Sequence, residues 1–179
     1  DALLIGGAIA HAFLIAQGHT VGRSVFEEAA VEAARRLLQQ HGGKIFLPKD
    51  VVCARSLRRD ATLTVKGIDE IGAVDRIVDI GPKTREAFAG VLAGAGTILW
   101  NGPLGYCEVS SFCAGTRDVA RAIAAQTGRA TTVVGGGDTL PVIETLGLAD
   151  KFTLLSTGGA ALLQFLAGQE LPGVEAVRA

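Results

Sequence analysis

The residues best suited to chemistry lie between Thr131 and Pro141, where three consecutive glycines precede an acid. The first residues of this stretch predict a β-strand, and the glycines at 135–137 would let the backbone approach a ligand closely. A helix beginning after them would direct unpaired N–H groups and its positive dipole end at the loop, which suits a phosphate. Asp138 then has two interpretations, a ligand for a divalent cation or an N-cap of the helix. This stretch alone does not separate them.

Three more predicted strands end in glycine-containing turns: Gly6-Gly7, Asn101-Gly102 and Gly158-Gly159. In a parallel sheet, all four exits lie at the carboxyl edge, where open α/β folds bind their ligands. Four such turns at one edge predict a nucleotide crevice. No G-x-x-x-x-G-K-[ST] motif is present, which excludes a P-loop protein, and the absence of G-x-G-x-x-G after the first strand argues against dinucleotide binding.

Two polar side chains near these turns have both a ligand-binding and a structural interpretation. Asn101, at the end of its strand, could donate its amide to a phosphate or stabilise the turn before Pro103. Glu108 could accept hydrogen bonds from ribose hydroxyls or be an ordinary surface acid. Local sequence favours the surface acid for Glu108.

The surrounding pattern predicts alternating strands and helices. Apolar runs predict strands near 2–5, 44–48, 51–54, 77–80, 97–100, 131–134 and 152–155. Helices are expected over 8–17, from a capping box of Ser24 and Glu27 to Gly42, over 84–92 and over 116–127. Two further helices are expected to end near residues 146 and 167, and an irregular tail follows. We expect an α/β fold, a three-layer Rossmann-like lobe with a mostly parallel sheet and helices on both faces. Residues 55–75 form a small excursion with an edge strand near 62–65, and no domain boundary is evident.

Composition narrows the class of protein. The 179 residues are 49% hydrophobic and 20% charged, with a net charge of −1. No apolar run reaches membrane-spanning length. The sequence also lacks the stripe of basic residues that is typical of nucleic-acid binding, so we do not expect a nucleic-acid partner. Cys53, Cys107 and Cys113 lack C-x-x-C spacing, so we expect free thiols in a reducing, cytoplasmic compartment. The histidines do not cluster with them, which argues against zinc, and the absence of methionine suggests that the segment starts inside a longer protein.

Several motifs together resemble one family. They are Trp100 to Gly105 (WNGPLG), Glu108, Gly115-Thr116, Gly135-Gly136-Gly137-Asp138-Thr139 and Ser156-Thr157-Gly158-Gly159. Weaker matches, such as Asp79-Ile80-Gly81-Pro82, follow in the same order. The combination resembles phosphoglycerate kinase and covers essentially all of 1–179. The resemblance implies that residues 1–179 are one nucleotide-binding, carboxy-terminal lobe, truncated at its start and lacking the phosphoglycerate-binding lobe.

The resemblance also implies roles for individual residues. The family transfers a phosphoryl group between 1,3-bisphosphoglycerate and Mg-ADP, with Mg²⁺ as cofactor and 3-phosphoglycerate and ATP as products. The implied metal ligand is Asp138. Backbone amides around Gly158 and Gly159 would face the transferring group and are the implied catalytic residues. The remaining implied nucleotide contacts are Gly6, Gly7, Gly81, Leu104 and Tyr106 at adenine, Glu108 at ribose, and Asn101, Gly135, Gly136, Gly137 and Thr139 at the phosphates.

The chain departs from the family in ways that set expectations. Ala8 and Ala160 stand where the family usually has glycine, and Tyr106-Cys107 replaces an aliphatic-aromatic pair at the base pocket. No lysine matches a catalytic position, so we expect the chain to bind nucleotide without catalysing transfer. The family resemblance also implies a monomer. A detached binding module, or a remnant with a blocked crevice, are the alternatives. Loss of an upstream strand would leave an unpaired sheet edge and marginal stability.

Overall fold

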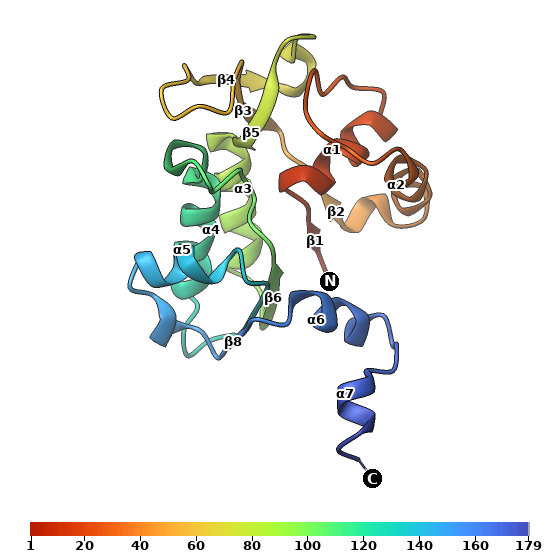
Figure 1. The fold of residues 1–179 in the computed structure, drawn as a ribbon, viewed down its shortest axis with the longest axis vertical. Coiled ribbons are helices and arrows are strands. Elements are labelled where there is room, and N and C mark those ends of the chain that lie inside the picture. Colours follow the sequence, from red (N-terminus) through yellow and green to blue (C-terminus); the bar gives the residue numbers. More distant parts are fainter. Residues whose placement is uncertain (179) are drawn as a thin grey trace.

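The computed structural model describes residues 1–178. Parallel sheets with helices packed around them confirm the predicted α/β class (Figure 1). The strands are divided among three hydrogen-bonded sheets, with the orders β1-β2, β4-β3-β5 and β6-β7-β8. The sequence had predicted one sheet, because strand propensity does not show which strands pair.

The largest core surrounds the parallel sheet β6-β7-β8. In this sheet Asn101 lies opposite Gly135, and Gly135 lies opposite Ser156, so three of the four predicted strand ends are side by side. The fourth, at Gly6-Gly7, follows β1, which belongs to another sheet. Buried apolar side chains including Phe88, Trp100 and Ile123 join the sheet to its helices. The elements are α3 (Pro82–Leu92), β6 (Thr97–Asn101), α4 (Ala114–Ala124), β7 (Thr131–Gly135), α5 (Leu140–Thr145) and β8 (Leu154–Ser156).

The amino-terminal part contains a short parallel pair and two helices. They are β1 (Leu3–Leu4), α1 (Gly7–Ala16), α2 (Glu28–His41) and β2 (Ile45–Phe46). The predicted capping box is wrong, because α2 begins at Glu28 without a side-chain cap. Ser24 instead donates to Val21 O (2.6 Å) and accepts a hydrogen bond from Ile77 N (2.8 Å). This contact with a distant strand takes the place of the local cap.

The third sheet is antiparallel and includes the predicted excursion. Its strands are β3 (Asp50–Ala54), β4 (Thr64–Gly67) and β5 (Arg76–Ile80), with β3 in the centre. The predicted edge strand is confirmed as β4. All five residues of β3 are buried, which explains their continuous apolar character after Asp50.

A groove of about 950 Å³ separates β1 from β6. Its walls include Leu3, Leu4, Leu92, Ile98 and Trp100. Within residues 1–178, β1 pairs only with β2, and β6 pairs with β7 alone. The groove therefore lies between two strand edges that have no partner within these residues.

The carboxy-terminal part carries two more helices, α6 (Gly159–Leu166) and α7 (Pro172–Glu175). Figure 1 shows α7 extending away from the rest of the molecule, where the sequence had predicted an irregular tail. None of the helices within the described residues combines the length and apolarity needed to cross a bilayer.

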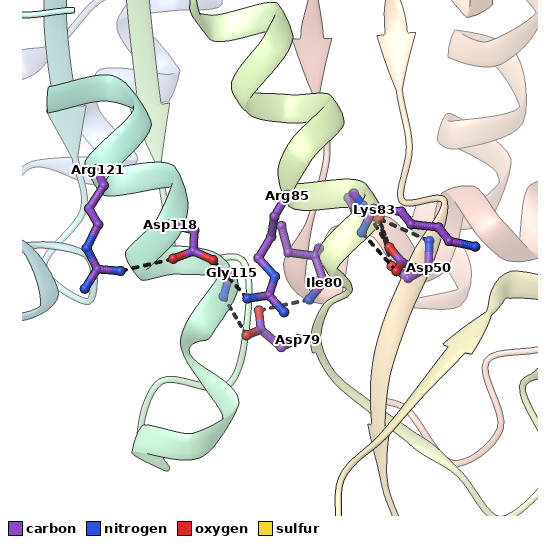
Figure 2. Close-up of polar contacts among 9 residues, drawn as sticks. Asp50, Asp79, Ile80, Lys83, Arg85, Gly115, Asp118 and Arg121 are labelled. Carbon is purple, nitrogen blue, oxygen red and sulfur yellow. Dashed lines mark hydrogen bonds and ion pairs between the residues drawn. The ribbon is translucent and has the colours of Figure 1, made fainter. Parts of the chain in front are cut away.

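Asp50 connects β3 to the start of α3. Its carboxylate accepts hydrogen bonds from the backbone amides of Lys83 (3.1 Å) and Thr84 (2.8 Å), and Thr84 Oγ1 is 2.7 Å from Asp50 Oδ1 (Figure 2). The N-cap residue of α3 is Gly81, which has no side chain. A carboxylate from another element therefore satisfies the free amides of this helix.

We predict that Asp50→Ala lowers the free energy of unfolding by about 1–3 kcal/mol, because it leaves buried amides without a partner. Urea unfolding followed by circular dichroism measures the loss. Asp60→Ala is the control, since that side chain is 76% exposed and, within residues 1–178, pairs with Arg58 alone. It should change stability by less than about 0.5 kcal/mol. Equal effects of the two substitutions would contradict the assigned role of Asp50.

Candidate functional site

A cavity of about 440 Å³ lies between the start of α1, strand β5 and the loop after β6. Gly7, Leu104, Tyr106 and Glu108 all line it, so the structure brings together four residues predicted at the adenine and the ribose. Tyr106 and Glu108 are exposed at the surface. Apolar side chains at positions 25, 57 and 77 also line the cavity, and those of Val25 and Leu57 are exposed. A mostly apolar cavity with polar groups at one end suits a flat heterocycle attached to a polar chain.

The start of α1 is held tightly against the loop after β6. Gly7 has φ +62°, and its amide donates to Leu104 O at 3.1 Å. A Cβ on Gly7 would lie 2.8 Å from Pro103 O, and one on Gly6 would lie 2.3 Å from Leu104 Cδ2. Only glycine allows both the backbone conformation and the close approach. Ala8, the departure from the family pattern, lines the same cavity.

The structure does not place Gly81 at this cavity, although the family resemblance implied that it would contact the adenine. Its amide donates to Asp50 O at 2.9 Å, and an added Cβ would lie 2.2 Å from Asp50 Cγ. Gly81 is buried at the start of α3 and does not line the cavity. The nearby Asp50 carboxylate leaves no room for a side chain at position 81, which explains the glycine there without a nucleotide contact.

Asp79 is a buried carboxylate on the cavity wall that sequence reasoning did not select. It accepts hydrogen bonds from the amides of Ile80 (2.9 Å) and Gly115 (2.7 Å), and thus caps α4 from β5 (Figure 2). Burial raises the pKa of Asp79 to about 6, although these two amides and the charge of Arg85 oppose the rise. Arg85 itself pairs with Asp118 at 2.9 Å.

A second group of predicted residues meets at the carboxyl ends of β6, β7 and β8. Asn101 Nδ2 donates to Gly159 O at 3.3 Å. A Cβ on Gly159 would lie 2.7 Å from Gly136 Cα, and one on Gly136 would lie 2.9 Å from Asn101 Oδ1. Three strand exits therefore form one compact backbone surface that only small residues permit. The Asn101 amide therefore holds two strand ends together, which is a different structural role from the predicted stabilisation of the turn before Pro103.

The neighbouring loop residues differ in what they can offer a ligand. Gly137 and Asp138 are exposed, whereas Gly135 is buried against Leu162. Thr139 is also buried, with its hydroxyl unpaired within residues 1–178, and its amide donates to Gly136 O at 3.2 Å. Thr139 thus faces the interior.

The structure contradicts one interpretation of Asp138. The N-cap position of α5 is Thr139, so Asp138 lies outside the helix end and does not cap it. Its exposed carboxylate is left available to a ligand.

In the loop after β8, some backbone amides donate hydrogen bonds to acceptors of the loop itself. Gly158 N bonds to Ser156 Oγ (3.2 Å), and Gly159 N bonds to Thr157 O (3.0 Å). These two amides stabilise the turn before α6. The amides of the first turn of α6, beginning with Ala160, are the donors that a helix leaves free for an anion.

The prediction of three free thiols is wrong. Cys107 and Cys113 form a disulfide, and Cys53 is the free cysteine among the described residues. The chain folds back through the 3₁₀ turn Ser110–Phe112, so that the Cα atoms of the bonded cysteines are 4.6 Å apart. Sequence spacing could not show this fold-back. The bond joins the cavity loop, between Tyr106 and Glu108, to the residue that precedes α4.

Comparison with known proteins agrees with this geometry. The family model described as phosphoglycerate kinase matches residues 1–169. The chain belongs to the phosphoglycerate kinase family. Phosphoglycerate kinase from Coxiella burnetii is 42% identical, with a TM-score of 0.90, and the match covers 98% of this chain and 46% of that one. The enzyme from Pyrococcus horikoshii OT3 is 30% identical, with a TM-score of 0.85, covering 99% of this chain and 45% of that one. The chain therefore spans just under half the length of these phosphoglycerate kinases.

Two residues of the cavity, Asp79 and His11, were not among the site residues predicted from the sequence. Asp79 interrupts an apolar strand, and an acid in such a run is a signal of a buried, hydrogen-bonded carboxylate. His11 had been considered only as a possible zinc ligand. Its spacing of four residues from Gly7 placed it on the same helix face, which was the available signal.

We predict that Gly136→Ala destabilises the chain by about 1–2 kcal/mol or more, because φ is +101° and the new Cβ would press on Asn101 Oδ1. Gly137→Ala is the matched control in the same loop. It has no positive φ and no atom within 4 Å of an added Cβ, so its stability should stay within about 1 kcal/mol of the parent. Thermal and urea unfolding of both variants compare them. A tolerated Gly136→Ala would disprove the tight packing at this loop.

We predict that alkylation of the unfolded, unreduced chain modifies one cysteine, Cys53, and that prior reduction raises the count to three. Intact mass measures both counts, and Cys53→Ser is the control, with none modified before reduction. In the folded chain Cys53 should react slowly, because burial raises the pKa of its thiol to about 11. Three modified cysteines without reduction would show that the disulfide is absent.

Proposed function

We propose that this chain supplies the Mg-ADP/ATP site of a phosphoglycerate kinase, which transfers a phosphoryl group between 1,3-bisphosphoglycerate and ADP. The observation that carries the proposal is the continuity of the two groups of residues described above. Asn101, at the strand exits, and Leu104, at the cavity, are three residues apart in one turn. Three residues span at most roughly 10 Å, a separation that a nucleotide bridges between its base and its phosphates.

The base would occupy the apolar cavity, with Leu104 and Tyr106 against its faces. Glu108, exposed at the same cavity, would accept hydrogen bonds from the ribose hydroxyls. The phosphates would then lie over the compact surface formed by Asn101, Gly136 and Gly159. Close backbone approach and first-turn amides favour anions at this place.

Magnesium fits the residues available at the glycine loop. Asp138 offers one exposed carboxylate, and Mg²⁺ typically takes one or two carboxylates together with phosphate oxygens and water. The metal would neutralise charge on the phosphates as the group is transferred. Asp138 would hold the metal, while amides at the start of α6 would orient the phosphoryl group.

The remaining proposals follow from the family. Phosphoglycerate would bind to a lobe outside this chain, and no lysine here matches a catalytic position, so we expect nucleotide binding without turnover from the 179 residues alone. Cytoplasmic location and a monomeric state stay predictions. The disulfide removes the argument for a reducing compartment that had rested on free thiols.

Calorimetric titration with ADP, with and without Mg²⁺, tests the proposal. We predict that Mg²⁺ strengthens ADP binding to the parent chain and that Asp138→Asn abolishes most of this gain, because the metal loses its protein ligand. Asp150→Asn is the control, since that exposed side chain pairs with neighbouring Lys151 alone in the described part of the chain. Unchanged magnesium dependence in Asp138→Asn would remove Asp138 as the ligand. Failure of the folded parent to bind ADP would contradict the nucleotide site itself.

A further inference from the structure

His11 presents a ring nitrogen to the cavity proposed for the base. It lies on α1, three residues after Ala8 and four after Gly7, so all three residues share one helix face and line the cavity. The residue is 6% exposed and therefore belongs to the inner part of the wall.

The hydrogen bond of His11 fixes which nitrogen carries the proton. His11 Nδ1 is 2.7 Å from Val25 O. A carbonyl oxygen only accepts hydrogen bonds, so Nδ1 carries the hydrogen and donates it. In the neutral ring, Nε2 is then a lone-pair acceptor. Nε2 has no partner within residues 1–178 and is not sealed from solvent, so it opens onto the cavity that the ring lines.

The environment of the ring keeps it neutral. Burial lowers the pKa of His11 below its ordinary value, although the bond to Val25 O opposes this effect. The apolar side chains of Val25, Leu57 and Ile77 line the same cavity, and within residues 1–178 neither carboxylate of its wall, Asp79 or Glu108, forms an ion pair with His11. At neutral pH the group facing a ligand is therefore an acceptor.

The other polar side chains of the inner wall are already engaged in hydrogen bonds within the protein. Ser24 Oγ already donates to Val21 O and accepts from Ile77 N. Both oxygens of Asp79 accept backbone amides. Arg76 can only donate, and one of its N–H groups bonds to Arg23 O at 2.9 Å. Within the inner wall, His11 Nε2 is therefore the side-chain acceptor that makes no hydrogen bond to the protein among residues 1–178.

We propose that His11 Nε2 accepts a hydrogen bond from the exocyclic amino group of adenine, and that His11 thereby selects adenine over 6-oxo purines. This inference rests on the proposed nucleotide site. A 6-oxo purine places a carbonyl oxygen where adenine carries the amino group, so two acceptors face each other. Such a mismatch leaves a buried polar group unpaired and weakens binding.

The test compares ADP with inosine diphosphate, which differs from ADP at this position of the base. We expect the parent chain to bind ADP about tenfold more tightly than inosine diphosphate in calorimetric titration with Mg²⁺, the scale of one lost hydrogen bond. His11→Phe should reduce the preference to about twofold or less. His41→Phe, at the exposed end of α2 and outside the cavity, should keep the parent preference.

The outcomes separate this inference from the proposed function. A parent that binds neither nucleotide contradicts the nucleotide site. A parent that binds both equally, or His11→Phe with the full preference for ADP, overturns the role of His11 alone. A preference for inosine diphosphate would also overturn it and would point to the donors of Arg76.

A measurement on the parent chain remains decisive if His11→Phe does not fold. Long-range ¹H–¹⁵N spectra of the histidine rings distinguish protonated from unprotonated nitrogens. We expect Nε2 of His11 to be unprotonated in the free chain and its resonance to shift when ADP is added. A similar shift with inosine diphosphate, or a protonated Nε2 in the free chain, would contradict the proposal.

Discussion

The hydrogen bonds of the Asp79 carboxylate connect the parts of the structure that form the site. From the end of β5, this side chain caps α4 through Gly115 N. A Cβ at Gly105 or Gly115 would lie 2.5 Å from Asp79 Oδ1, so both glycines allow the carboxylate to lie between the cavity loop and the helix. The raised pKa of Asp79, about 6, shows that burying this charge is costly. The loop that carries Leu104 and Tyr106 is held to the same two elements by hydrogen bonds from Leu104 N to Thr116 Oγ1 (3.0 Å) and from Tyr106 N to Val78 O (2.9 Å).

Asp50 has the same role one strand away. Each of these two aspartates satisfies the first amides of a helix to which it does not belong, α3 for Asp50 and α4 for Asp79. Helix N-termini need such acceptors, and here Gly81 and Cys113 at the N-cap positions supply none. The caps also determine where α3 and α4 begin relative to β3 and β5. Helix capping and the position of the cavity are therefore one arrangement.

The strand exits depend on small residues in contact rather than on buried charge. Asn101, Gly136 and Gly159 come from three adjacent strand ends and touch through backbone atoms and one side-chain amide. A surface made of backbone needs no side chain to be oriented when a ligand arrives, which suits the phosphate site proposed here. The exposed carboxylate of Asp138 lies beside it on the same loop. The disulfide of Cys107 and Cys113 restricts the opposite side, at the cavity loop.

The sequence by itself determined the alternation of strands and helices, the glycine turns at the strand ends and the family, because these depend on local periodicity and on motifs along the chain. Four residues that the family resemblance had assigned to one nucleotide, Gly7, Leu104, Tyr106 and Glu108, line one cavity in the structure. Only the tertiary structure decided that Gly81 packs against Asp50, that Ser24 bonds to Ile77 instead of capping α2, and that Cys107 pairs with Cys113. Each of these depends on which distant segments come into contact. Such contacts are set by the packing of the whole chain, and residue type and spacing do not reveal them.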